Sequence, residues 1–148
     1  KRDSVIFNNG PHKFEAGTPG IVEMIGLGAA IDFIQQIGMD NIQKYEHNLT
    51  EYAQSELSNL GWLSIHGNAK EKGAIFSFTM SGLAHAHDLS TILDRKGVAV
   101  RAGQHCAQPL MDHLGIEASC RASFAMYNTL SEVDILTKEL KYCYQMFN

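Results

Sequence analysis

Apolar residues recur at helical spacing in the longer stretches of this chain and alternate with polar residues in the shorter ones. Helical spacing predicts helices over residues 18–37, 40–60, 88–96 and 129–147. Alternation predicts strands over residues 62–66, 74–80 and 120–127, and a β-branched run predicts another at 98–100. With a short apolar turn at 109–111, this order is typical of an α+β fold. In such a fold, helices pack on a small, mostly antiparallel sheet.

Capping residues set the expected ends of the helices. The expected N-terminal caps are Thr18 with Pro19 in the first helical position, Asp40 with Gln43, and Thr129 with Glu132. The first helix, which we expect to end at Gly38, has little sheet of its own to cover. We therefore expect two parts: residues 1–38, which look as if they belong to a different structural unit, and a small domain at 39–148.

The composition narrows the classes of function. With 148 residues, 45% hydrophobic and 19% charged, the chain is long enough for one sizeable core. A net charge of −4 gives no reason to expect nucleic acid or an anionic membrane as a partner. No apolar run approaches the ~20 residues needed to span a bilayer. Three cysteines without a CxxC pair indicate free thiols and a reducing compartment, so we expect the cytoplasm.

The segment from residue 98 to residue 127 contains the side chains best suited to chemistry. Cys106 follows Gly103 in a polar loop, and a nearby cation or histidine would favour its nucleophilic thiolate. From the residues alone, Cys106 is either such a nucleophile or, like most free cysteines, a small buried hydrophobe. Cys120 lies in the apolar row of its predicted strand and Cys143 in the last turns of a helix, so we expect both to be buried.

Two arginines accompany this thiol. Alternation along the strand predicts that Arg121 points away from the apolar row. Its planar guanidinium is suited to bind a carboxylate through two hydrogen bonds, whereas a solvated surface position is the ordinary alternative. Arg101 just before the loop has a weaker case, because a structural ion pair would explain it as well.

Histidines raise the question of a metal site. His85, His87, His105 and Cys106 are all possible zinc ligands, but their spacing matches no known short zinc pattern, and we expect no metal. His105, next to the thiol, is the histidine best placed to tune it, with a plain surface histidine as the alternative. Gly17 and Thr18, at the expected helix start, could bind an anion or could simply form a cap.

Three motifs occur in order along the chain: Phe-Glu-Ala-Gly-Thr-Pro at 14–19, Arg-Ala-Gly-Gln-His-Cys-Ala-Gln-Pro-Leu at 101–110, and Cys-Arg-Ala-Ser-Phe-Ala-Met-Tyr-Asn-Thr at 120–129. Together they closely resemble the C-terminal part of the SUF-type (type II) cysteine desulfurases. That family belongs to the class V aminotransferase group of pyridoxal 5'-phosphate (PLP) enzymes. Gln104 departs from members that have two histidines before the cysteine.

The resemblance implies a reaction and a role for each site residue. The expected activity converts L-cysteine to L-alanine and passes sulfur, as a persulfide, to a sulfur-acceptor protein of the SUF system for iron–sulfur cluster assembly. It implies that Cys106 is the nucleophile, that Arg121 binds the substrate carboxylate, and that Arg101 helps to order the cysteine loop. Gly17 and Thr18 are expected to reach the cofactor phosphate of the partner subunit in a homodimer.

The resemblance also implies a division of the chain. Residues 1–38 correspond to the tail of the large PLP domain with its linker helix, and residues 39–148 to the small C-terminal domain. The lysine that anchors PLP is expected to lie outside these residues, so the chain is expected to be inactive alone.

Other functions stay open at this point. A selenocysteine lyase would use the same residues, whereas a class V aminotransferase needs no thiol at position 106. A stand-alone metal- or sulfur-binding module is the alternative outside enzymes. It would leave the apolar face of helix 18–37 without a partner.

Overall fold

The computed structural model describes residues 4–15, 17–82 and 84–147, and the chain divides into two compact units, Lys1–Met39 and Asp40–Asn148. The first unit contains a 3-10 turn, η1 (His12–Phe14), and the helix α1 (Ile21–Ile37). No residue of α1 is buried, and apolar side chains such as Val22 and Ile25 are 79% and 70% exposed. The described residues of the first unit therefore form no core of their own.

The start of α1 corrects a prediction. The helix follows Gly20, whose carbonyl accepts the first helical hydrogen bond from Met24 at 3.0 Å, so the predicted cap at Thr18 and Pro19 is wrong. Gly20, with a φ of −70° and a ψ of 77°, takes the non-helical conformation of the cap instead, so the helix begins two positions later than predicted. The predicted end is confirmed, since Gly38 has a φ of 90° and donates to Ile34 at 3.0 Å.

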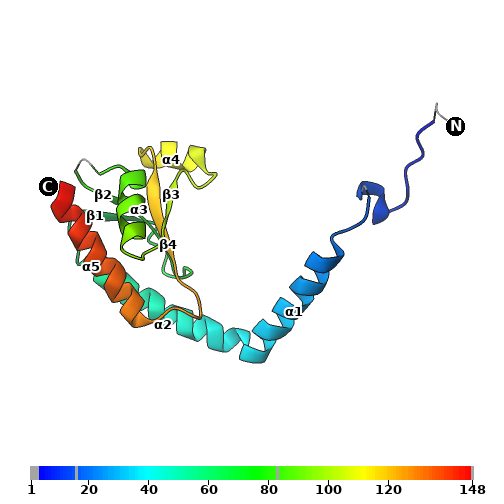
Figure 1. Ribbon diagram of the computed structural model, residues 1–148, viewed down its shortest axis with the longest axis horizontal. Helices are drawn as coiled ribbons and strands as arrows, with labels where there is room; N and C mark the ends of the chain where they lie inside the picture. The colour runs from blue at the N-terminus through cyan, green and yellow to red at the C-terminus, as the bar shows by residue number, and fades with distance from the viewer. Residues whose placement is uncertain (1–3, 16, 83, 148) are drawn as a thin grey trace. The chain divides into compact units, whose positions relative to one another are not determined.

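The second unit contains a four-stranded sheet in the order β1-β2-β4-β3, with every neighbouring pair antiparallel (Figure 1). The strands are β1 (Leu63–His66), β2 (Ile75–Met80), β3 (Arg101–Gly103) and β4 (Ser119–Ser123). The helices are α2 (Met39–Ser58), α3 (Ala86–Arg95), α4 (Gln108–Leu114) and α5 (Leu130–Phe147). The predicted α+β fold is thereby confirmed.

One face of the sheet carries the core. Phe76 and Phe78 of β2 alternate with polar residues and are fully buried, as their spacing predicts. The helices α2, α3 and α5 cover this face, each contributing buried leucines to one cluster. Burying each large apolar side chain contributes about 1.5–3 kcal/mol, so this face supplies most of the stability of the unit.

No single helix in the described residues is long and apolar enough to cross a membrane. The consecutive pair α1 and α2 is the one pair among the described helices that reaches the required length and composition together, and α2 buries Leu49, Ala53 and Leu57 in the core cluster.

Two strand predictions are corrected by the pairing. The third strand is not residues 98–100 but β3, because Arg101, Ala102 and Gly103 are the residues that pair with β4. The fourth strand ends at Ser123 instead of continuing to 127, because Asn128 closes a turn: its side chain accepts from the Ala125 amide at 2.9 Å. Pairing with β4 thus decided the bounds of β3, whereas a local turn ended β4.

The helix caps had mixed outcomes. The helix α2 already includes Met39, so Asp40 lies in its first turn and does not precede it as the predicted cap requires. The capping box of α5 is confirmed: the Glu132 amide donates to Thr129 Oγ1 at 3.3 Å, and the Thr129 amide donates to Glu132 Oε2 at 2.7 Å.

Replacing the cap residue tests how much this box stabilises the fold. We expect Thr129→Ala to lower the free energy of unfolding by about 1 kcal/mol, because one amide at the helix start loses its acceptor. Thr129→Ser, which keeps the hydroxyl, is the matched control and should stay near the original stability. Urea unfolding followed by circular dichroism measures both, and equal stability of the alanine and serine variants would contradict the assignment.

Candidate active site

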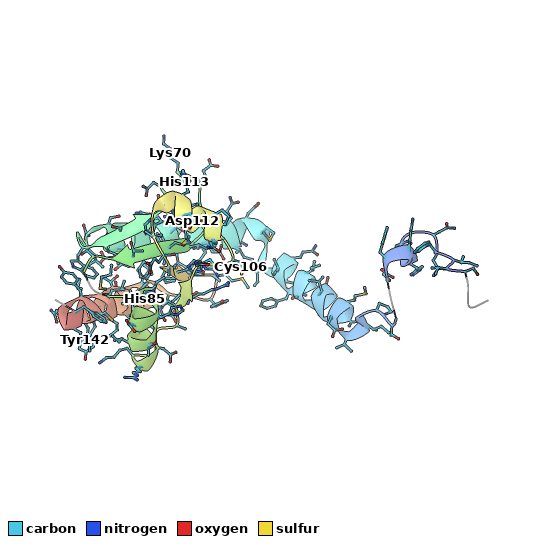
Figure 2. All side chains as sticks on the ribbon, turned by 90° about the horizontal axis from the view of Figure 1, so that it is seen from above. Lys70, His85, Cys106, Asp112, His113 and Tyr142 are labelled. Carbon is cyan, nitrogen blue, oxygen red and sulfur yellow. The ribbon has the colours of Figure 1, made fainter. Side chains whose placement is uncertain are left out.

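Cys106 lies on a tight turn between β3 and α4 (Figure 2). The turn is closed by a hydrogen bond from the Ala107 amide to the Gln104 carbonyl at 2.9 Å. Its two central residues, His105 and Cys106, have φ values of 57° and 58°, a left-handed geometry that residues with a Cβ seldom adopt. The turn leaves the Cys106 side chain exposed, so the sulfur is accessible from outside.

Arg101 lies beside this sulfur. Its Nη2 donates to Cys106 Sγ at 3.7 Å, from an exposed position at the start of β3. Within residues 4–15, 17–82 and 84–147, Arg101 forms no ion pair with a carboxylate, so the structural ion pair that would have explained it is not formed. A guanidinium next to a thiol is suited to stabilise the negative charge of a thiolate.

The other two cysteines are unsuited to this chemistry. Cys120 is buried in the core, donates to the Ala86 carbonyl at 3.2 Å, and has a pKa that burial raises to about 12. Cys143 is also buried, and its pKa is raised by burial and by the nearby Glu139. Their predicted burial is confirmed, and Cys106 is the accessible thiol of this sequence.

Arg121 lies on the face of β4 opposite to the core, as alternation predicts. It is directly opposite Arg101 in the pairing of β3 with β4, so the two guanidinium groups belong to neighbouring positions on one face. The Nε atom of Arg121 is buried and has no hydrogen-bond partner among the described residues. A buried donor without an acceptor is costly, and a carboxylate ligand would satisfy it.

A cavity of about 290 Å³ separates α4 from this face of the sheet. Its lining includes polar residues from the sheet and the Cys106 turn and apolar residues of α4, namely His66, Ser77, His105, Ser119, Arg121, Leu110, Met111 and Leu114. No motif or spacing in the sequence singles out His66, Ser77 or Ser119. The strand registers place His66 beside Ser77, and Ser77 beside Arg121.

The half-buried histidines of this cavity differ in their contacts. His66 Nε2 lies 3.0 Å from Thr79 Oγ1, and burial lowers the pKa of its imidazole, which favours the neutral ring. His105 Nε2 lies 3.0 Å from both the carbonyl and the hydroxyl of Ser119, and its Nδ1 is buried without a partner in the described chain. The ring of His105 is therefore hydrogen-bonded to β4. Its tuning of the thiol stays a prediction.

Gly17 and Thr18 belong to the first unit. Gly17 has a φ of 85° with open space around it, and Thr18 is exposed in the loop before α1. The N-cap of α1 is Gly20, which offers no side-chain hydrogen bond to the first amides of the helix, and Glu23 lies in the first turn with its carboxylate close to Gly20. Such amides fit a phosphate group. The roles of Gly17 and Thr18 stay predictions.

The histidines do not gather into a metal centre. In the part of the chain that the structure describes, no group of three or more His, Cys, Asp or Glu side chains could hold a metal ion. His85 and His87 stack on each other with ring centroids 5.4 Å apart, whereas the His105 ring is bound to Ser119.

Comparison with known proteins gives consistent matches along the chain. The sequence profile of the aminotransferase class-V family matches residues 1–136. A probable cysteine desulfurase of Xylella fastidiosa is 49% identical over 132 residues, which are 89% of this chain and 32% of that protein. A cysteine desulfurase of Haloferax volcanii is 46% identical over 138 residues, 93% of this chain and 32% of that protein.

Solved structures agree with these matches. The apo structure of a cysteine desulfurase from Thermococcus onnurineus has a TM-score of 0.87 and 36% identity, and covers 99% of this chain and 36% of its own. The cysteine desulfurase CsdA of Escherichia coli has a TM-score of 0.85 and 33% identity, covering 93% and 34%. The chain spans about one third of the length of the curated relatives it matches.

The accessibility of the three thiols can be tested by alkylation. We expect iodoacetamide to modify Cys106 in the native chain and to reach Cys120 and Cys143 only after unfolding. With a pKa of about 12, Cys120 has on the order of one thiolate in ten thousand at pH 8 before its burial is considered. Peptide mapping by mass spectrometry before and after urea measures the labels, with Cys106→Ser as the control that should take up none before urea is added. Comparable native labelling of Cys120 would contradict the structure.

Proposed function

The chain belongs to the aminotransferase class-V family, and from this membership we propose that it is the C-terminal part of a PLP-dependent cysteine desulfurase. The whole enzyme removes sulfur from L-cysteine and releases L-alanine. One observation carries the proposal: an exposed thiol on a strained turn has a guanidinium 3.7 Å away. A transaminase would have no use for this thiol.

Cys106 takes the sulfur in this proposal. Its thiolate attacks the sulfur of L-cysteine, so an S–S bond forms as the substrate's C–S bond breaks. The electron pair of the broken bond goes to the carbon, which takes up a proton to give L-alanine. The product on the protein is a persulfide of Cys106, and the reaction needs no outside oxidant because the carbon is reduced as the sulfur is oxidised.

Arg121 orients the substrate. The guanidinium binds the carboxylate of L-cysteine through two parallel hydrogen bonds, which fixes the direction of the amino acid as well as its position. The buried Nε of Arg121 supports this role, since it has a donor to offer and no acceptor in the described residues. Arg101 supports the charge of the thiolate beside it.

PLP would be held in part by the first unit. The bound cofactor supplies the electron sink that lets the C–S bond break. Its phosphate would be held by Gly17, Thr18 and the uncapped amides at the start of α1. In a homodimer, these groups would reach the cofactor of the partner subunit. The lysine that anchors PLP belongs, in this proposal, to the remaining two thirds of the enzyme.

The wider role of the enzyme follows from the persulfide. We propose that it acts in iron–sulfur cluster assembly of the SUF type, where a sulfur-acceptor protein removes the sulfur from Cys106. We also propose that it acts in the cytoplasm. The three free cysteines support a reducing compartment. The same residues could take selenium from selenocysteine, so measured preference between the two amino acids decides that alternative.

Removing the thiol tests the proposal directly. In the complete enzyme, we expect Cys106→Ala to abolish persulfide formation and alanine release from L-cysteine while PLP still binds, because the sulfur has lost its acceptor. The assays are alanine by chromatography and the mass gain of one sulfur atom on the protein. Cys143→Ala, at a buried thiol outside the site, is the control and should keep sulfur transfer. Alanine release at the normal rate from Cys106→Ala would remove this thiol from the mechanism.

A second test concerns the carboxylate. We expect Arg121→Lys to lower kcat/KM for L-cysteine almost as much as Arg121→Ala, by ~10- to 100-fold, or on the order of 1.5–3 kcal/mol. Lysine keeps the charge but loses the two-pronged geometry. With cysteamine, which lacks the carboxylate, the kcat/KM of wild type should be no higher than that of the two Arg121 variants. Arg95→Ala, at the exposed end of α3, is the surface control. A preference for cysteine over cysteamine that survives Arg121→Ala would place the carboxylate site elsewhere.

A further inference from the structure

We propose that His105 is a positioning residue, which holds the Cys106 turn in place by anchoring it to Ser119 of β4. The anchor is a property of the fold. Its effect on sulfur transfer rests on the proposed function.

The turn needs outside support because its own sequence disfavours it. Two central residues with positive φ are the mark of a type I′ turn, for which glycine, asparagine or aspartate are the suitable residues. Here the positions are His105 and Cys106, with φ values of 57° and 58°. Both residues have a Cβ that opposes this geometry, so local preference alone would favour another conformation. Contacts from elsewhere in the fold must therefore hold the turn.

The His105 ring makes such a contact. Its Nε2 lies 3.0 Å from the Ser119 carbonyl oxygen and 3.0 Å from the Ser119 hydroxyl. A carbonyl oxygen can only accept, so Nε2 carries the proton and donates it. In the neutral ring Nδ1 is then a bare acceptor, buried and facing no partner in the described chain. The geometry thus assigns one tautomer to His105.

The position of Ser119 makes the anchor relevant to the site. Ser119 is fully buried, pairs with Gly103 at the end of β3, and lies two residues before Arg121 on the same face of β4. His105 therefore ties the turn that carries the thiol to the strand that carries the proposed carboxylate clamp. The other side-chain contact of the turn, from Arg101 to Cys106 at 3.7 Å, joins two exposed groups and is the weaker restraint.

The anchor therefore affects the attack of the thiolate on the substrate and not the binding of the substrate. Holding Cys106 at a fixed distance from Arg121 affects how often the thiolate meets the substrate sulfur, and a small misplacement of a reacting group is costly. In the proposed function the substrate carboxylate is bound by Arg121, and His105 makes its hydrogen bonds to Ser119 instead. Loss of the anchor should therefore lower kcat and leave KM for L-cysteine nearly unchanged.

A matched pair of variants tests the anchor in the 148-residue chain. Gln at position 105 can offer an N–H in nearly the same place as Nε2, whereas Leu has similar bulk and no donor. We expect His105→Leu to speed hydrogen exchange of the Ala107 amide, which closes the turn, by about tenfold, and His105→Gln to stay within about threefold of the original. In the original chain, the ring nitrogen chemical shifts of His105 should show protonated Nε2 and bare Nδ1. Unchanged exchange in His105→Leu, or a proton on Nδ1 alone, would overturn the anchor.

The complete enzyme tests the consequence. We expect His105→Leu to lower kcat about tenfold with KM for L-cysteine within about twofold, and His105→Gln to recover most of the loss. Equal losses in both variants would mean that the imidazole itself acts, and would overturn the positioning role. If the exchange result holds but the enzyme does not desulfurate cysteine, the proposed function fails while the anchor stands.

Discussion

Antiparallel pairing of β3 with β4 places Arg101 opposite Arg121 and Gly103 opposite Ser119. Like charges opposite each other on neighbouring strands destabilise a sheet, and neither arginine has a carboxylate partner within the described chain. The pairing therefore concentrates positive charge on one face at some cost in stability. That cost is reduced when an anion arrives, whether a thiolate on Cys106 or a carboxylate beside Arg121.

The stability that tolerates this arrangement comes from the opposite face. Cys120 and Ala122 alternate with Arg121 along β4 and lie in the core cluster with the aromatic residues of β2. A slip of one residue in the pairing would bring Arg121 into the core and expose that apolar row. Hydrophobic packing by α2, α3 and α5 thus fixes the register, and the register in turn fixes the arginines.

Local patterns predicted much of this structure. Alternation along β2, the capping box at Thr129 and the different settings of Cys106 and Cys120 are all readable from neighbouring residues. The start of α1 and the bounds of β3 and β4 were not, because a glycine cap, distant strand pairing and the turn closed by Asn128 set them. His66, Ser77 and Ser119 carried no signal at all. Each joins the site only through its partner across the sheet, and a single sequence does not show strand register.

The exposure of Cys106 and the burial of Cys120 and Cys143 together determine how a group attached to the Cys106 sulfur can be removed. Many redox proteins pair a reactive cysteine with a second, resolving cysteine that displaces the adduct as an internal disulfide. In these 148 residues Cys120 and Cys143 are enclosed in the core and cannot approach Cys106 without unfolding. An adduct on Cys106 must therefore await a thiol from outside these 148 residues, so its lifetime is set by encounter with that thiol and not by Cys120 or Cys143.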